Sequence, residues 1–85
     1  MSDIQKIIID TDNAIKTCME QLFFYHQNVK LILPNKTKVL MLCNQYLNIL
    51  QQAQKANVYK FLNQDQIQAN LLILNDINKA FAKVK

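Results

Sequence analysis

The sequence predicts an all-α fold, an antiparallel up-down-up three-helix bundle with a long first helix. Three observations lead to this prediction: the 85 residues include no glycine and a single proline, and the apolar residues recur at helical spacing. A glycine inside a helix costs about 1 kcal/mol relative to alanine, whereas the tight hairpins of β proteins depend on glycine. Since short connections favour antiparallel neighbours, three successive helices give the up-down-up order.

The first helix is expected over residues 2–33, because apolar residues follow one another there in alternating steps of four and three. This heptad-like stripe consists of Ile4, Ile8, Thr11, Ile15, Cys18, Leu22, Tyr25, Val29 and Ile32. Residues 10–13 (DTDN) favour caps and turns, so a break at that point is the alternative. The uninterrupted stripe favours one long helix.

Pro34 and Asn35 mark the first connection, since proline disfavours helical geometry in the residue before it and asparagine caps helices. The second helix is expected over residues 35–56. Its main apolar face consists of Val39, Leu42, Cys43, Tyr46, Ile49, Leu50 and Ala53. The junction that follows is less distinct: Asn57 ends the helix in one interpretation, and the helix reaches residue 62 in the other.

Residues 57–62 are expected to cover the start of the first helix. The isoleucines at that start, Ile4, Ile7, Ile8 and Ile9, would extend past a second helix that stops at residue 56. The preferred interpretation folds residues 57–62 back as a lid over these isoleucines, with Val58, Tyr59, Phe61 and Leu62 as the cover. In the alternative, the isoleucines contact another chain.

The third helix is expected over residues 64–84. Asn63 is followed three residues later by Gln66, which is the spacing of a capping box. Lysines near the end of the chain suit the negative C-terminal end of this helix.

The two cysteines are expected to remain thiols. If the first connection is centred near residues 34–35, Cys43 lies beside His26 and Cys18 beside residue 51, which separates the thiols by roughly 10 Å along the helix axes. A disulfide needs Cα atoms within about 7 Å. His26 then lies level with Cys43, but no acidic residue orients it and no glycine-rich oxyanion loop exists, so we expect no catalytic pair.

The composition also excludes several classes of function. Walker A loops and Rossmann turns need glycine where the backbone approaches a phosphate. One histidine and two cysteines without CxxC spacing make no zinc set, and residues 10–13 lack the glycine of a calcium loop. We therefore expect no enzymatic activity, no cofactor, no metal and no small-molecule substrate.

The chain is expected to be a single helical domain over residues 1–85 and to be cytoplasmic. No signal peptide is visible, and the longest apolar run, residues 39–43, is far shorter than the ~20 residues that cross a bilayer. Two cysteines are too few for a secreted disulfide scaffold. A domain of this size gains little beyond its chain entropy, so a partner or a second copy would stabilise it.

The apolar residues exceed what three bundle helices can bury. A bundle helix buries about three or four residues in seven, whereas residues 7–9, 39–43 and 71–74 are apolar without interruption. The residues expected to form an exposed partner-binding face are Ile7, Ile9, Phe24, Leu31, Leu40, Met41, Leu72 and Ile73. The leading hypothesis is a non-enzymatic protein–protein interaction module (a small helical adaptor, chaperone, inhibitor or immunity-type factor) that binds a protein partner or forms a homodimer.

Lysines gather at one end of the predicted bundle. The net charge is +4, and all ten basic residues are lysine. The end that holds the first connection and the C-terminus carries Lys30, Lys36, Lys38, Lys79, Lys83 and Lys85, against Asp76 alone. The alternative hypothesis is a regulator that binds nucleic acid or an anionic membrane surface through this end. Base-specific recognition is not expected, because arginine is absent and no aromatic residues are interleaved with these lysines.

Overall fold

The computed structural model describes residues 3–82, and helices account for most of that length. The elements are α1 (Asp3–Gln27), η1 (Val29–Leu31), α2 (Lys36–Lys55), η2 (Tyr59–Phe61) and α3 (Gln64–Ala82), where η marks a single turn of 3-10 helix. No strand occurs among residues 3–82, so the predicted all-α class is confirmed.

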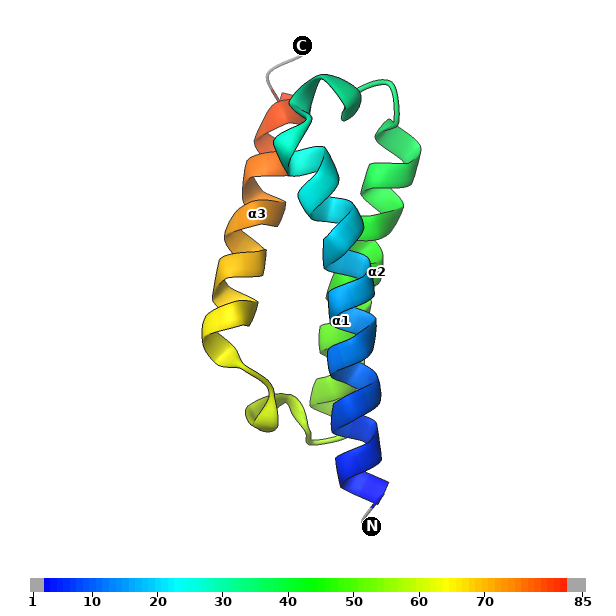
Figure 1. The fold of residues 1–85 in the computed structure, drawn as a ribbon, viewed down its shortest axis with the longest axis vertical. Coiled ribbons are helices and arrows are strands. Elements are labelled where there is room, and N and C mark those ends of the chain that lie inside the picture. The colour runs from blue at the N-terminus through cyan, green and yellow to red at the C-terminus, as the bar shows by residue number, and fades with distance from the viewer. Residues whose placement is uncertain (1–2, 83–85) are drawn as a thin grey trace.

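The helices pack side by side in a molecule whose principal extents are 49, 19 and 17 Å. α1 packs against both α2 and α3. In Figure 1 the α1–α2 connection and the end of α3 lie at one end of the molecule, and η2 lies toward the other end, where α1 begins. The arrangement is that of a helical bundle in which α1 packs against both other helices.

α1 is one continuous helix and does not break at residues 10–13. Thr11 and Asp12 are half-buried, while Asn13 is exposed on the solvent side. The apolar stripe continues across these residues, from the half-buried Ile8 to the buried Ile15. Packing on this stripe outweighs the preference of the polar residues for caps and turns.

The predicted end of the first helix at residue 33 is wrong, because α1 ends at Gln27. At Asn28 the backbone leaves the helical region, with φ −122° and ψ 65°. The Asn28 side chain then donates a hydrogen bond to the carbonyl of Phe24 at 2.7 Å. This bond occupies one of the carbonyls that a helix end leaves without an intrahelical partner.

The early end of α1 shifts the pairing of α1 with α2. Cys18 Sγ donates to the carbonyl of Leu42 at 3.3 Å, so these two residues lie side by side. Lys30 stands midway between them in the chain, whereas we expected the hairpin to be centred at residues 34–35. The predicted placement of Cys18 beside residue 51 is therefore wrong.

A Schellman motif ends α2 and is centred on Asn57, which has a positive φ of 61°. The amide of Val58 donates to the carbonyl of Ala53 at 3.0 Å, and that of Asn57 donates to Gln54 at 3.1 Å. Val58 and Ala53 are both buried, which supplies the apolar contact of this motif. Asparagine serves here because it tolerates the left-handed region better than other residues with a Cβ.

Residues 57–62 turn back toward the bundle without covering the isoleucines at the start of α1. Val58 and Leu62 are buried in the main core, whereas Phe61 is 55% exposed. Ile8 packs in part against the core, but Ile4, Ile7 and Ile9 remain exposed. The predicted lid is therefore wrong for these isoleucines, because the apolar side chains of residues 57–62 that are buried pack into the main core.

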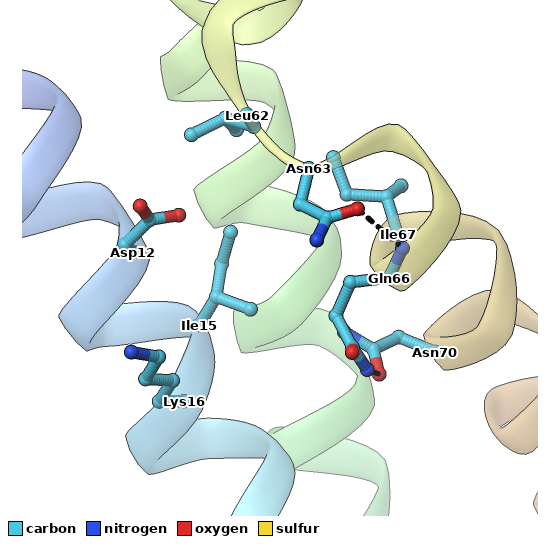
Figure 2. Close-up of a pocket in the computed structure, with 8 residues that line it drawn as sticks. All are labelled: Asp12, Ile15, Lys16, Leu62, Asn63, Gln66, Ile67 and Asn70. Carbon is cyan, nitrogen blue, oxygen red and sulfur yellow. Dashed lines mark hydrogen bonds between the residues drawn. The ribbon is translucent and has the colours of Figure 1, made fainter.

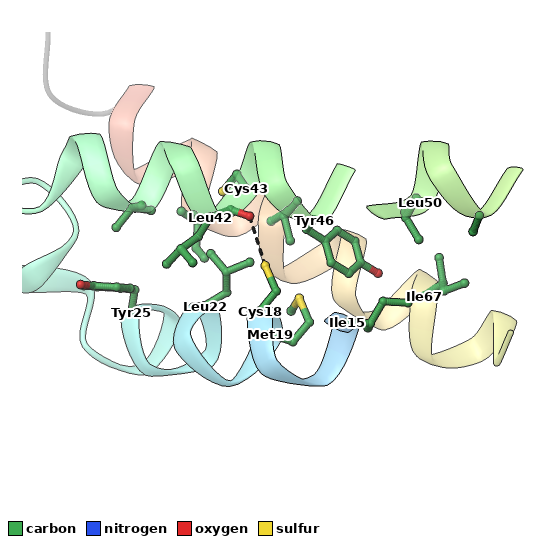
Figure 3. Packing of buried hydrophobic residues seen from close by; sticks show 14 of the residues in the cluster. Ile15, Cys18, Met19, Leu22, Tyr25, Leu42, Cys43, Tyr46, Leu50 and Ile67 are labelled. Carbon is green, nitrogen blue, oxygen red and sulfur yellow. Dashed lines mark hydrogen bonds between the residues drawn. The ribbon is translucent and has the colours of Figure 1, made fainter. Parts of the chain in front are cut away.

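The core is one cluster shared by the three helices (Figure 3). Figure 3 shows Cys18 and Leu22 of α1 facing Leu42 and Tyr46 of α2. The buried members are Ile15, Cys18, Met19, Leu22, Tyr25, Ile32, Val39, Leu42, Cys43, Tyr46, Leu50, Ala53, Val58, Leu62, Ile67, Leu74 and Ile77. α3 enters this core just after its cap, where the Gln66 amide donates to Asn63 Oδ1 at 3.1 Å.

Candidate interaction surfaces

The predicted partner-binding residues are spread over all three helices and η1. Ile7, Ile9 and Phe24 lie on α1, Leu31 in η1, Leu40 and Met41 on α2, and Leu72 and Ile73 on α3. All of them are exposed except Ile73, which is half-buried and packs against the core. Met41 and Leu72 have the largest exposed fraction, 66% each. The eight residues therefore do not form one continuous face.

The start of α1 is the first surface at which exposed apolar side chains gather. In Figure 1 this end of α1 projects beyond the connection between α2 and α3. Ile4, Ile7 and Ile9 are exposed on it. Ile4 and Ile7 lie on the side that continues the core-facing stripe, and Ile9 lies on the outer side. We call residues 4–9 the projecting end of α1.

A groove between α1 and α2 runs into the projecting end. Its volume is about 340 Å³. The residues that line it are Ile7, Asp10, Thr11 and Ala14 of α1, and Asn48, Ile49 and Gln52 of α2. Ile7 belongs to both features, so the groove and the projecting end form one continuous surface.

The opposite end of the molecule carries the predicted lysines. Lys30 lies in η1, Lys36 and Lys38 in the first turn of α2, and Lys79 in the last turn of α3, and all four are exposed. The predicted residues Lys83 and Lys85 lie outside the described part of the chain. The nearby acid, Asp76, accepts a hydrogen bond from His26 Nε2 at 3.1 Å, and both side chains are partly exposed.

Three exposed aliphatic residues at the lysine-rich end form a surface that the sequence did not predict. Val29, Leu31 and Leu33 are 58%, 38% and 43% exposed, while Ile32 between them is buried. The heptad-like spacing predicted Val29 on the core-facing stripe of a longer helix, and Leu33 lies outside that stripe. A usable signal was Asn28, whose side chain caps the preceding turn and ends the helix.

A cavity of about 250 Å³ lies between α1 and the start of α3 (Figure 2). Asp12 and Lys16 line it from α1, and Asn63, Gln66 and Asn70 line it from the opposite side. The Gln66 side chain donates through Nε2 to Asn70 Oδ1 at 3.0 Å, and the backbone N–H of Gln66 donates to Asn63 Oδ1. These bonds lie within the start of α3 and order its first two turns.

Asn70 is the one buried polar residue among residues 3–82, and Tyr46 of α2 is its neighbour in the core. Burial raises the pKa of Tyr46, and Asn70 beside it opposes part of that rise. Neither Tyr46 Oη nor Asn70 Nδ2 completes a hydrogen bond to the described residues. An unpaired buried donor costs about 1–3 kcal/mol, so each of these two groups lowers the stability of the bundle relative to a paired one.

The thiols are free, and both are buried in the core. Burial raises the pKa of Cys18 and Cys43 above the ordinary value of 9.0, and the proximity of Cys18 adds to the rise at Cys43. Both thiols are therefore protonated and weakly nucleophilic at neutral pH. The predicted level of His26 beside Cys43 is wrong, because His26 pairs with Asp76 of α3 and Cys18 lies beside Leu42.

The part of the chain that the structure describes holds no cluster of three His, Cys, Asp or Glu side chains suited to a metal ion. Within the same residues, no helix combines the length and the apolar character that crossing a bilayer requires. Comparison with protein-family models, curated proteins and solved structures finds no match to this chain.

Proposed function

We propose that the protein is a non-enzymatic protein–protein interaction module, built as an up-down-up three-helix bundle, that binds through the projecting end of α1 and the adjoining groove. The observation that carries the proposal is the exposure of Ile4 and Ile7 on the core-facing side of a helix that has outrun its neighbours. Full burial of one such side chain is worth about 1.5–3 kcal/mol, so covering this end favours association.

The groove gives the partner a defined place to bind. It lies between α1 and α2, and its lining combines the apolar Ile7, Ala14 and Ile49 with polar residues of both helices. The polar members, Asp10, Thr11, Asn48 and Gln52, can fix the orientation of a bound segment. An amphipathic helix is a segment that such a mixed groove can accept along its apolar face.

A second copy of this chain is the partner that we propose, because its projecting end offers an apolar surface of the same kind. In an antiparallel pairing about a two-fold axis, the exposed Ile4 and Ile7 of each copy cover those of the other. The same pairing places Ile7 of each copy against the stripe of its partner, as an isologous interface requires.

The test is the oligomeric state of the pure protein, measured by sedimentation velocity over a range of concentrations. We expect a concentration-dependent dimer that the double substitution Ile4→Gln and Ile7→Gln converts to a monomer. The matched control is Leu72→Gln, which removes an even more exposed side chain from α3 and should leave the dimer intact.

Two results would contradict the proposal. The first is a wild-type chain that remains monomeric at high micromolar concentration, and the second is a dimer that both variants weaken equally. Far-ultraviolet circular dichroism of each variant shows whether the helices are retained, so that loss of the dimer is not confused with loss of the fold.

A further inference from the structure

We propose that the lysine-rich end of the molecule docks on an anionic lipid bilayer, with the aliphatic side chains of the α1–α2 connection inserted at the level of the lipid headgroups. We call this end the tip. It consists of Val29, Leu31 and Leu33 together with Lys30, Lys36, Lys38 and Lys79. The proposal is independent of the projecting end of α1, which lies at the opposite end of the molecule.

The aliphatic side chains of the tip are held outward by a rigid connection. Ile32 is 1% exposed and anchors the connection in the core between Leu31 and Leu33. The Asn35 side chain donates to the carbonyl of Leu31 at 2.8 Å, and the Ile32 amide donates to the carbonyl of Val29 at 3.1 Å. These bonds fix the backbone, so the exposed side chains cannot turn inward without breaking it.

The tip is positively charged with little local compensation. No acidic residue occurs between Glu20 and Asp65, a stretch that contains the whole connection and the whole of α2. Asp76, which accepts a hydrogen bond from His26, is the one carboxylate among the described residues at this end. Each lysine near an anionic membrane strengthens binding by about fivefold, and stable binding needs both basic charge and inserted apolar groups. The tip supplies both.

The chemistry of the tip favours lipid over protein or nucleic acid. Protein interfaces are enriched in aromatic residues and arginine and depleted in lysine, and the tip has only lysine and aliphatic side chains. Nucleic-acid surfaces use aromatic stacking and arginine contacts and have no need of three exposed aliphatic side chains. A bilayer surface accepts aliphatic side chains below its headgroups, while lysine stems extend so that the ammonium groups stay among the phosphates.

The experiment uses the absence of tryptophan from the chain. Leu33→Trp places a single fluorophore at the tip, and Leu72→Trp places one on the exposed face of α3. With vesicles of phosphatidylserine and phosphatidylcholine, we expect a blue shift and quenching by brominated acyl chains for the Leu33→Trp protein. We expect neither change for the Leu72→Trp protein, nor for either protein with vesicles of phosphatidylcholine alone.

Two sets of variants measure separately how much the lysines and the aliphatic side chains of the tip contribute to vesicle binding. Replacing Lys30, Lys36 and Lys38 with glutamine should weaken vesicle binding by about 100-fold, from about fivefold per lysine. The matched control replaces Lys6, Lys55 and Lys60, which lie toward the other end, and should change binding much less. The double variant Leu31→Gln and Leu33→Gln, which keeps all the lysines, should also weaken vesicle binding by tenfold or more.

Three results would overturn the proposal. The first is a Leu33→Trp signal that is unchanged by anionic vesicles. The second is vesicle binding that the aliphatic double variant leaves intact. The third is stronger binding to duplex DNA than to vesicles at equal salt, with dependence on the lysines alone, which would assign the tip to a nucleic acid.

Discussion

At the scale of single residues, an asparagine stands at each of the four helix junctions, and Asn57 takes a position that glycine occupies in most proteins. Asn57 takes the left-handed conformation that ends α2. Asn28 and Asn35 each donate a side-chain hydrogen bond to the carbonyl four residues earlier. Asn63 accepts the bond that starts α3. A chain without glycine therefore still has four well-defined helix junctions, because the asparagine side chain is short enough to reach its own backbone.

Asn57 gives the clearest prediction at this scale. Asn57→Ala should lower the free energy of unfolding by about 1–2 kcal/mol, because alanine tolerates a left-handed φ of 61° less well than asparagine does. Asn57→Gly should leave that free energy unchanged or raise it. Urea unfolding of the three proteins measures the difference, with Asn13→Ala on the exposed face of α1 as a control. Equal stability of the alanine and glycine variants would show that the left-handed geometry does not matter.

At the scale of elements, the α1–α2 connection decides more than its length suggests. Periodicity placed Val29 and Ile32 on a continuous helix, and both steps, from Tyr25 to Val29 and from Val29 to Ile32, fit that pattern. The side chain of Asn28 ends the helix locally, and hydrophobic spacing carries no information about such a bond. The predicted range of the second helix, residues 35–56, lies within one residue of α2 at each end, because Pro34 and Asn57 stand just outside its limits, and the alternative that reached residue 62 is wrong. Because the predicted helix continued past Asn28, the predicted hairpin was centred too late in the chain. Cys18 was therefore expected beside residue 51, whereas it lies beside Leu42.

The connection should depend on its buried anchor. Ile32→Ala should lower the free energy of unfolding by about 2–5 kcal/mol, since it removes a fully buried side chain and leaves a cavity under the tip. Leu33→Ala, one residue further on, should change it by about 0.5 kcal/mol or less because that side chain is exposed. Thermal or urea unfolding distinguishes the two. A small effect of Ile32→Ala would mean that the connection is held by its backbone bonds alone.

At the scale of the whole molecule, the sequence indicated how much apolar surface would remain outside but not where it would gather. Ile9, Met41 and Leu72 were predictable as exposed, because uninterrupted apolar runs cannot all face one core. The gathering of Val29 and Leu33 with the lysines was not predictable, because it follows from the early end of α1. The exposure of Ile4 likewise follows from where residues 57–62 turn back. These surfaces are products of packing between elements that are distant in the sequence.

Two buried thiols and one buried phenol make the stability of the whole bundle depend on pH. The folded state raises the pKa of Cys18, Cys43 and Tyr46 above their ordinary values of 9.0 and 10.0. In the unfolded chain these groups lose their protons first, so the unfolded state binds fewer protons at high pH. The free energy of unfolding should therefore be level near neutral pH and fall as pH rises through 9.0 and then 10.0.

Urea unfolding across this pH range measures the fall. The double variant Cys18→Ala and Cys43→Ala should lose the part of the slope near pH 9 and keep the part near pH 10. The two alanines also create cavities, whose cost in free energy does not depend on pH. Comparing the slopes of the free energy of unfolding against pH therefore removes that cost. A free energy of unfolding that rises between pH 8 and 10 would contradict this assignment.

The two ends of the bundle also differ in what they can reach. The longest extent of the molecule is 49 Å, and the projecting end of α1 and the lysine-rich tip lie at its opposite ends. That separation is several times the distance, about 8–10 Å, over which salt screens charge. A molecule held upright by its tip would therefore present its isoleucines well outside the ionic atmosphere of the surface. Occupation of one end leaves the other sterically open, which is the geometry of a short, rigid tether.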